Sequence, residues 1–126
     1  MRIDLNTKIA IVGASNNPEK YGYEVYKDLK ENGFNVIPVN IHEQEIQNDK
    51  AYNYLKDYPE KIDLIVLVIP PDQGLNVLSQ ALAMQIKKVW FQPGSESEDL
   101  IKFTKEHDFE YVANACIMVE RRKWPK

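Results

Sequence analysis

Runs of apolar residues alternate along this chain with segments in which apolar residues recur every three or four positions. The runs are short and nearly continuous, which is typical of strands buried on both faces, and they occupy residues 9–12, 34–39, 63–69, 88–91 and 109–113. Helical spacing follows the first, third and fourth runs. This alternation predicts an α/β fold, a doubly wound parallel sheet in a three-layer α/β/α arrangement.

Local signals predict where the helices begin and end. Asn32-Gly33 predicts the end of the first helix, because glycine suits the left-handed C-cap. Asp72 is the expected N-cap of the second helix, whose apolar face is expected to carry Leu75, Leu78 and Leu82. Ser95, with Glu98 three residues later, predicts a capping box for the third helix.

The predicted topology places a crevice at one edge of the sheet. Right-handed crossovers put strand 34–39 on one side of the first strand and strand 63–69 on its other side. The loops 13–20 and 69–72 then face each other, at the position where open α/β sheets bind ligands. Gly13 follows the first strand directly and allows the backbone to approach a phosphate at a helix N-terminus.

The turn after the first strand departs from the dinucleotide fingerprint. That fingerprint has Gly-x-Gly-x-x-Gly here and an acidic residue at the end of the second strand. This chain has Gly13-Ala-Ser-Asn-Asn-Pro18 and Asn40 at these places, so the ribose of NAD would lose its usual acceptor. A redox- or metabolite-responsive domain that binds NAD(P) or another nucleotide therefore stays as an alternative only.

Composition narrows the class of protein. The 126 residues suffice for one domain, 1–126, and a net charge of −3 gives no reason to expect nucleic acid or a membrane as partner. A single cysteine excludes an intramolecular disulfide, and the N-terminus is too polar for a signal peptide, so a cytoplasmic location is expected. The basic tail, 121–126, is expected to be solvated, with packing on a phosphate or a second subunit as the alternative.

Few residues suggest catalysis. Cys116 has neither a base nor a helix N-terminus next to it in the sequence, which favours a buried, unreactive thiol over a nucleophile. Two histidines and one cysteine at irregular spacing predict no metal site. Because no acid–base pair stands out, binding without catalysis is the leading hypothesis, and a thioester-handling enzyme that uses Cys116 is the alternative.

Several short motifs occur in an order that resembles a known family. They are Val12-Gly-Ala-Ser15, Asn17-Pro18, Tyr21-Gly22, Ile37-Pro-Val-Asn40, Ala51-Tyr52, Val68-Ile-Pro-Pro71, Val89-Trp-Phe-Gln-Pro-Gly94 and Cys116-Ile-Met-Val-Glu120. From about Thr7 to Glu120 the chain is similar to the small bacterial and archaeal CoA-binding proteins. These are single Rossmann-like domains similar to the CoA-binding domain of the succinyl-CoA synthetase α subunit. The resemblance implies a protein that carries, senses or stores coenzyme A or an acyl-CoA. The tail and the sheet edge at the last strand leave both a monomer and a homodimer open.

The resemblance also implies where CoA lies in the crevice. The pyrophosphate is expected near the first turn, where backbone, short donors and one charge come from Gly13, Ala14, Ser15, Asn16, Lys20, Tyr21 and Gly22. The adenosine is expected beside Val39, Asn40, Ile41 and His42. Asn40 would read a ribose hydroxyl or a ring edge, or would serve only as a turn residue. The pantetheine arm is expected along a wall formed by Pro70, Pro71, Gln92, Pro93 and Gly94.

The chain departs from the family pattern in its turns. Asn48 and Gln85 stand where relatives usually carry glycine, and asparagine tolerates a left-handed backbone better than glutamine does. Ile41-His42 stands where relatives commonly have proline after Asn40. The 3′-phosphate of CoA is then left with His42, which is a cation only when protonated.

Overall fold

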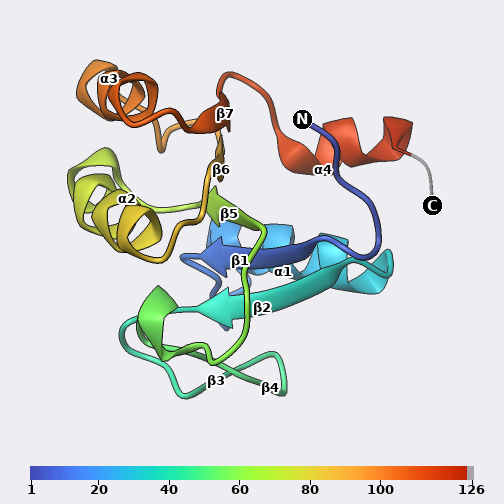
Figure 1. Ribbon diagram of the computed structural model, residues 1–126. Helices are drawn as coiled ribbons and strands as arrows, with labels where there is room; N and C mark the ends of the chain where they lie inside the picture. The colour runs from blue at the N-terminus through green and yellow to red at the C-terminus, as the bar shows by residue number, and fades with distance from the viewer. Residues whose placement is uncertain (125–126) are drawn as a thin grey trace.

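The computed structural model describes residues 1–124 and is built on a five-stranded parallel sheet (Figure 1). The strands lie in the order β2 (Asn35–Val39), β1 (Lys8–Val12), β5 (Leu64–Leu67), β6 (Lys88–Phe91) and β7 (Glu110–Val112). All five predicted strands are present, although β5 and β7 are shorter than predicted at both ends. In the sheet, β1 lies between β2 and β5, the next two strands of the sheet along the chain. This order confirms the predicted switch point.

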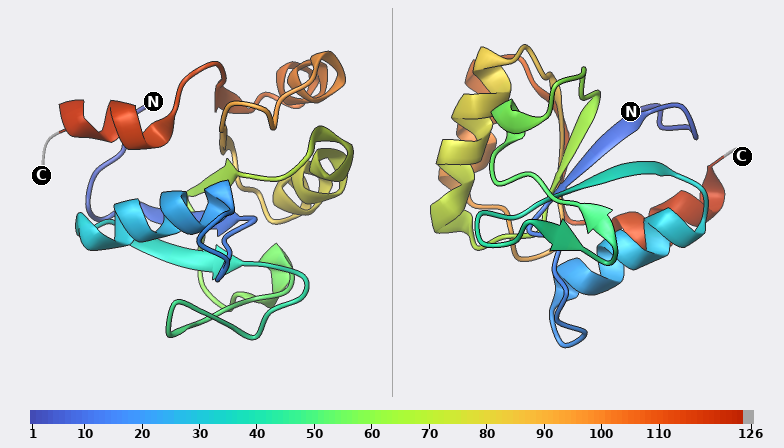
Figure 2. Two further views of the ribbon diagram at one scale, coloured as in Figure 1. Left: turned by 180° about the vertical axis from the view of Figure 1, so that it is seen from behind. Right: turned by 90° about the horizontal axis from the view of Figure 1, so that it is seen from below.

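Two pairs of helices cover the two faces of the sheet. Figure 2 shows α1 (Tyr21–Glu31) and α4 (Ile117–Glu120) on one face, and α2 (Gly74–Ala83) and α3 (Glu98–Glu106) on the other. Each face has its own apolar core, because every strand residue of β5 is buried. The predicted three-layer arrangement is confirmed. Within residues 1–124, no helix is both long and apolar enough to cross a membrane.

Residues 40–62 hold more structure than the expected loop and turns. A two-stranded hairpin, β3 (Glu45–Ile46) and β4 (Asp49–Lys50), precedes the short 3₁₀ helix η1 (Leu55–Asp57). Asn48 in the hairpin turn has φ 70°, and Gln85 has φ 62°. Both positions that usually carry glycine in the family are thus left-handed here.

Both predicted N-caps are wrong. Asp72 lies inside a 3₁₀ turn, η2 (Pro71–Gln73), because the chain already coils at the second proline of the pair, and α2 begins only at Gly74. The cap of α3 is Ser97, the last extended residue before the helix, whose Oγ accepts from the Leu100 N–H at 3.2 Å. Ser95 turns inward instead, where its buried Oγ accepts from the Ile69 N–H at 3.1 Å and links the ends of β5 and β6.

The buried face of α2 also differs from the prediction. Leu75 is 52% exposed, and the buried stripe consists of Gly74, Leu78 and Ala81. Gly74 lies in this stripe because α2 packs closely on α3: a Cβ at this position would meet the side chain of Leu100.

The C-terminal segment packs back on the molecule through Arg121 and Trp124, so the expectation of a solvated tail is wrong for these two residues, whereas Arg122 and Lys123 are exposed as expected. Arg121 donates two hydrogen bonds to Asp28 of α1, at 2.9 Å from Nε and 2.8 Å from Nη2. This carboxylate raises the pKa of Arg121. Trp124 makes edge contacts with Phe34 and with the buried Trp90, at ring separations of 5.8 Å. Residues 125 and 126 of the predicted tail lie outside the described residues.

Two glycines bring the start of α1 against the end of β1. Gly13 has φ 100°, and a Cβ there would meet the backbone carbonyl of Val68. A Cβ on Gly22 would meet the carbonyl of Gly13. Both obstacles are backbone atoms, which cannot rotate aside as a side chain could.

We expect Gly22→Ala to lower the free energy of unfolding by about 2–3 kcal/mol, because the added methyl group overpacks a backbone carbonyl. Gly33→Ala is the matched control, since Gly33 has φ 85° and a Cβ there comes no nearer than 3.9 Å to a neighbouring atom. The control carries only left-handed strain, about 1 kcal/mol. Denaturant unfolding of both variants measures the difference, and equal losses would contradict the expectation.

Candidate functional site

Two adjoining cavities lie over the carboxyl ends of β1, β2, β5 and β6. The α2 cavity, of about 460 Å³, lies between α2 and the residues that follow β2. The turn cavity, of about 560 Å³, lies between the start of α1 and the loops that follow β5 and β6. Gly13, Asn40 and Ile69 line both cavities, so the two form one continuous crevice. The crevice lies at the predicted switch point.

Most of the predicted site residues line this crevice. In the turn cavity these are Gly13, Ser15, Lys20, Tyr21, Gly22, Asn40, Pro70, Pro71, Pro93 and Gly94. In the α2 cavity they are Gly13, Val39, Asn40, Ile41 and His42. Residues as far apart in the sequence as Gly13 and Gly94 are thus brought to one edge of the sheet, as the topology predicted.

Three predicted residues, Ala14, Asn16 and Gln92, do not line the crevice. Ala14 is fully buried, and Gln92 is fully buried behind the turn cavity. Asn16 is tied to the β3–β4 hairpin: its Nδ2 donates to the Glu45 carbonyl and its Oδ1 accepts from the Gln47 N–H, each at 2.8 Å. In this structure the three residues support the crevice wall.

Asn40 is also engaged by the protein. Its Nδ2 donates to the Ala14 carbonyl at 2.9 Å, and its Oδ1 accepts from the His42 N–H at 2.8 Å. The side chain therefore joins the end of β2 to the turn after β1. This arrangement favours the alternative of a turn residue over a reader of the ribose.

The start of α1 presents backbone donors to the turn cavity. Lys20 is the N-cap of α1 and has extended φ/ψ, but its side chain makes no capping hydrogen bond. Tyr21 and Gly22 follow it and line the cavity. The first N–H groups of a helix lack partners within the helix and carry partial positive charge, so this end of α1 favours an anion.

The contribution of α2 was missed in the sequence. Gln73, Asn76, Val77 and Gln80 line the α2 cavity, and Tyr54 lines it from the segment before η1. Spacings of three and four residues place these α2 side chains on one face of the helix. The spacing could have indicated from the sequence that these side chains share one face of the site. Polar residues on an amphipathic helix, however, usually indicate only a solvated face.

A hydrogen-bonded cluster lies directly behind the turn cavity. Tyr21 Oη donates to Cys116 Sγ at 3.1 Å. Gln92 Nε2 donates to Tyr21 Oη at 2.7 Å and to the sulfur at 3.5 Å, and Gln92 Oε1 accepts from the Ile117 N–H at 2.7 Å. The buried amide of Gln92 thus fixes both the phenol and the thiol.

The environment of Cys116 differs from the expectation. The thiol is only partly buried, it is the N-cap of the four-residue α4, and two side chains donate to it. Burial alone would raise the pKa of the Cys116 thiol, but the hydrogen bonds from Tyr21 and Gln92 and from the backbone of α4 lower it below its ordinary value. Burial and the neighbouring sulfur raise the pKa of Tyr21, which therefore stays the donor.

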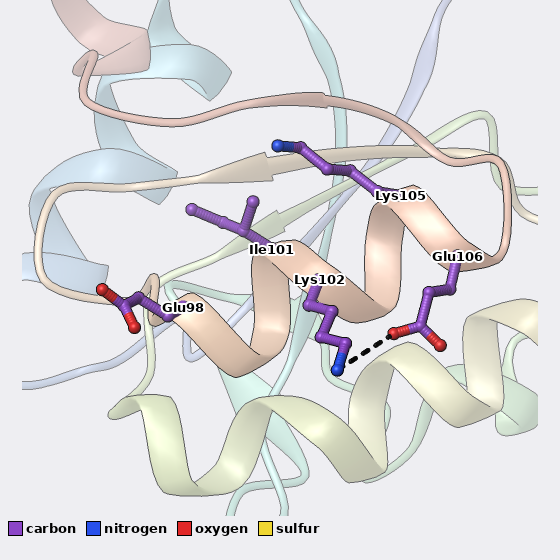
Figure 3. A pocket seen from close by; sticks show the side chains of 5 residues that line it. All are labelled: Glu98, Ile101, Lys102, Lys105 and Glu106. Carbon is purple, nitrogen blue, oxygen red and sulfur yellow. Dashed lines mark ion pairs between the residues drawn. The ribbon is translucent and has the colours of Figure 1, made fainter.

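Another hollow, of about 580 Å³, lies on the outer side of α3 (Figure 3). Its lining side chains, Glu98, Ile101, Lys102, Lys105 and Glu106, all come from this one helix. Lys102 and Glu106 form an ion pair at 4.0 Å. A surface of one helix brings few groups to bear on a ligand. Within residues 1–124, no three His, Cys, Asp or Glu side chains are grouped as a metal ion would need.

Comparison with known proteins decides the family. Residues 7–122 match the family model of the CoA binding domain. The chain belongs to the CoA-binding domain family. Its Rossmann-like fold and its resemblance to CoA-binding proteins are therefore confirmed.

Relatives of this CoA-binding domain include parts of larger enzymes. Over an aligned stretch of 63 residues, the chain is 52% identical to the α subunit of acetate–CoA ligase (ADP-forming) II from Pyrococcus furiosus. The aligned stretch covers 49% of this chain and 14% of that protein. The chain thus spans a small part of this ligase subunit.

Solved structures agree with this assignment. A hypothetical protein from Pyrococcus furiosus has a TM-score of 0.87 and 47% identity, over 90% of this chain and 98% of that one. A dinucleotide-forming acetyl-coenzyme A synthetase from Candidatus Korarchaeum cryptofilum has a TM-score of 0.75 and 26% identity, over 86% of this chain and 25% of that one.

We expect Tyr21→Phe to slow alkylation of Cys116 several-fold near neutral pH and to move the midpoint of the rate–pH profile upward. The phenol stabilises the thiolate, so its removal leaves less thiolate below the pKa of the thiol. Iodoacetamide labelling followed by mass spectrometry measures the profile. Tyr23→Phe, on the same helix, is the control. A midpoint that is the same in both variants would refute the role of the phenol.

Proposed function

We propose that this chain binds coenzyme A or an acyl-CoA in the crevice and has no catalytic activity of its own. Membership of the CoA-binding domain family supports the ligand class. The observation that carries the proposal is the continuity of the crevice: from the Gly13 turn it extends both toward α2 and toward the proline-lined loops. A ligand with an anionic centre and two long arms matches this shape.

Each part of CoA has a matching surface. The pyrophosphate would lie at the Gly13 turn, where the first N–H groups of α1 and the Lys20 ammonium attract an anion. The adenosine would enter the α2 cavity, and the pantetheine arm would follow Pro70, Pro71 and Pro93 in the turn cavity. His42 lines the α2 cavity and is the candidate partner of the 3′-phosphate.

We propose the lack of catalysis because the serine hydroxyls near the crevice accept hydrogen bonds from the backbone of the protein. Ser15 Oγ accepts from the Asn17 N–H at 3.0 Å, and Ser95 Oγ accepts from the Ile69 N–H at 3.1 Å. Both hydroxyls thus stabilise loops. Carriage, sensing or storage of CoA, a monomeric or homodimeric state and a cytoplasmic location stay predictions.

The lowered pKa of Cys116 favours a second candidate, a thioester-handling enzyme. In this alternative the Cys116 thiolate would attack the thioester carbonyl of an acyl-CoA, so that an acyl-cysteine forms as the bond to the CoA sulfur breaks and CoA leaves as its thiolate. Tyr21 lies between the thiol and the turn cavity, so the side chain would have to move for attack. Protection of Cys116 from alkylation by bound CoA would support this candidate, and unchanged labelling would refute it.

Binding of NAD(P) is disfavoured by the end of β2. Asn40 stands at the position of the acidic residue, and both polar ends of its amide are already used by Ala14 and His42. One lone pair of its oxygen remains, which cannot replace the two-oxygen acceptor that a carboxylate offers to a ribose hydroxyl pair. Competition of CoA with NADH and with ADP separates the two ligand classes.

We expect CoA to raise the melting temperature of the protein, with a shift that grows with the logarithm of ligand concentration. At 100 times Kd the stabilisation is about 2.7 kcal/mol. Lys20→Ala should weaken binding about 3- to 5-fold through loss of one charge near the pyrophosphate, a loss of about 1 kcal/mol at a partly solvated site. Thermal denaturation and calorimetry measure both effects.

Lys27→Ala is the control for this experiment, because Lys27 lies on α1 away from the crevice and pairs with Glu31 at 3.5 Å. Mass spectrometry of small molecules released from the denatured protein identifies any acyl group that copurifies. A folded protein whose melting temperature does not change in millimolar CoA would rule the proposal out.

A further inference from the structure

The α2 cavity contains an amide that the protein leaves without a hydrogen bond. Gln80 lies on α2 and lines this cavity. Its Oε1 is buried and has no hydrogen-bond partner, the one such buried side-chain nitrogen or oxygen among residues 1–124. Burying an acceptor without a donor is costly, so a cavity-lining side chain that carries such an atom points to a donor that it meets when the amide turns toward a ligand.

Three amides around the crevice are committed to protein partners: Asn16 binds the β3–β4 hairpin, Asn40 joins two turns, and Gln92 holds the Tyr21–Cys116 pair. Gln80 has a buried carboxamide oxygen without a hydrogen bond, whereas the other two amides of the α2 cavity, Gln73 and Asn76, are exposed to solvent. The terminal torsion of glutamine is broad, so this amide can turn its oxygen or its nitrogen toward a ligand without breaking a hydrogen bond.

The walls around Gln80 suit a flat heterocycle. Val39 and Ile41 line the α2 cavity on the side of β2, and Val77 lines it one helical turn from Gln80. Tyr54, which is 43% exposed, closes the cavity from the segment before η1. Apolar walls beside a buried amide oxygen without a partner suit a planar base that carries a hydrogen-bond donor on its edge.

We propose that Gln80 determines the base specificity of this site by recognising the adenine of bound CoA. The carboxamide oxygen accepts from the 6-amino group of adenine, and the amide N–H₂ donates to the adjacent ring nitrogen. Glutamine pairs with adenine in this two-bond arrangement when proteins read DNA. The inference depends on the proposed function, because it requires the adenosine of CoA to occupy the α2 cavity.

Gln80→Met tests this role because it keeps the length of the side chain and its helix propensity but removes both polar atoms. We expect the variant to bind CoA about 5- to 10-fold more weakly. Without ligand its melting temperature should be equal to or above that of the wild type, because an unsatisfied buried acceptor has been removed. A side chain with a purely structural role would lose stability instead.

A CoA analogue with hypoxanthine in place of adenine provides a second readout. This base presents an oxygen where adenine has its 6-amino group. The wild type should prefer CoA over the analogue by about 5- to 10-fold, and Gln80→Met should bind the two equally. Gln44→Met is the matched control: it is the same substitution at an exposed position that lines neither cavity. It should keep the preference.

The outcomes separate this inference from the proposed function. A wild-type protein that does not bind CoA would overturn both. A wild type that binds CoA, with an unchanged preference for adenine in Gln80→Met, would overturn the role of Gln80 alone. Loss of unliganded stability in this variant together with equal weakening for both ligands would also overturn it, because that pattern indicates a structural role.

Discussion

A side chain at residue 22 would occupy the place of the Gly13 carbonyl, and a side chain at residue 13 would meet the carbonyl of Val68. Contact between these backbone segments is therefore possible only because both positions lack a Cβ. The contact sets the distance between the end of β1, the start of α1 and the end of β5. Since Gly13 lines both cavities, the shape of the whole crevice depends on it.

Polar side chains around this contact fall into two groups. The first group makes its hydrogen bonds within the protein and holds the hairpin, the turns and the thiol in place; it consists of Asn16, Asn40 and Gln92. Lys20 and Gln80 line the crevice at its two cavities without such commitments. A frame whose amides are already satisfied costs little to desolvate when a ligand enters, whereas the uncommitted groups gain new partners.

Apolar runs were sufficient to predict the sheet, because a strand buried on both faces leaves a nearly continuous pattern. The switch point then followed from handedness alone. Helix caps were not predictable in the same way, since Pro71 starts a 3₁₀ turn and Ser95 is drawn inward by the Ile69 N–H. The contact between Ser95 and Ile69 joins segments that lie far apart in the sequence, whereas the turn at Pro71 is local and took the place of the expected cap.

Long-range pairing also explains what the sequence could not show about the site. Tyr21 and Cys116 are 95 positions apart, so nothing near Cys116 in the sequence indicated a donor to its sulfur. Asn40 looked equally suited to a turn and to a ribose, and only the contacts to Ala14 and His42 distinguish them. The lack of a hydrogen bond to the Gln80 amide can be recognised only from the folded structure, because it depends on which groups surround the side chain.

The charges of the crevice limit how CoA would be held under the proposed function. Lys20 is the one permanent cation among its lining residues, and Asp72 is an opposing acid. One partly solvated ammonium, even together with the imidazole of His42, cannot balance a pyrophosphate and a 3′-phosphate. Most of the affinity must then come from the N–H groups of α1, from the base in the α2 cavity and from apolar contact with the pantetheine arm. These short-range contributions are screened little by salt, so binding should depend less on ionic strength than in a site built from lysine and arginine.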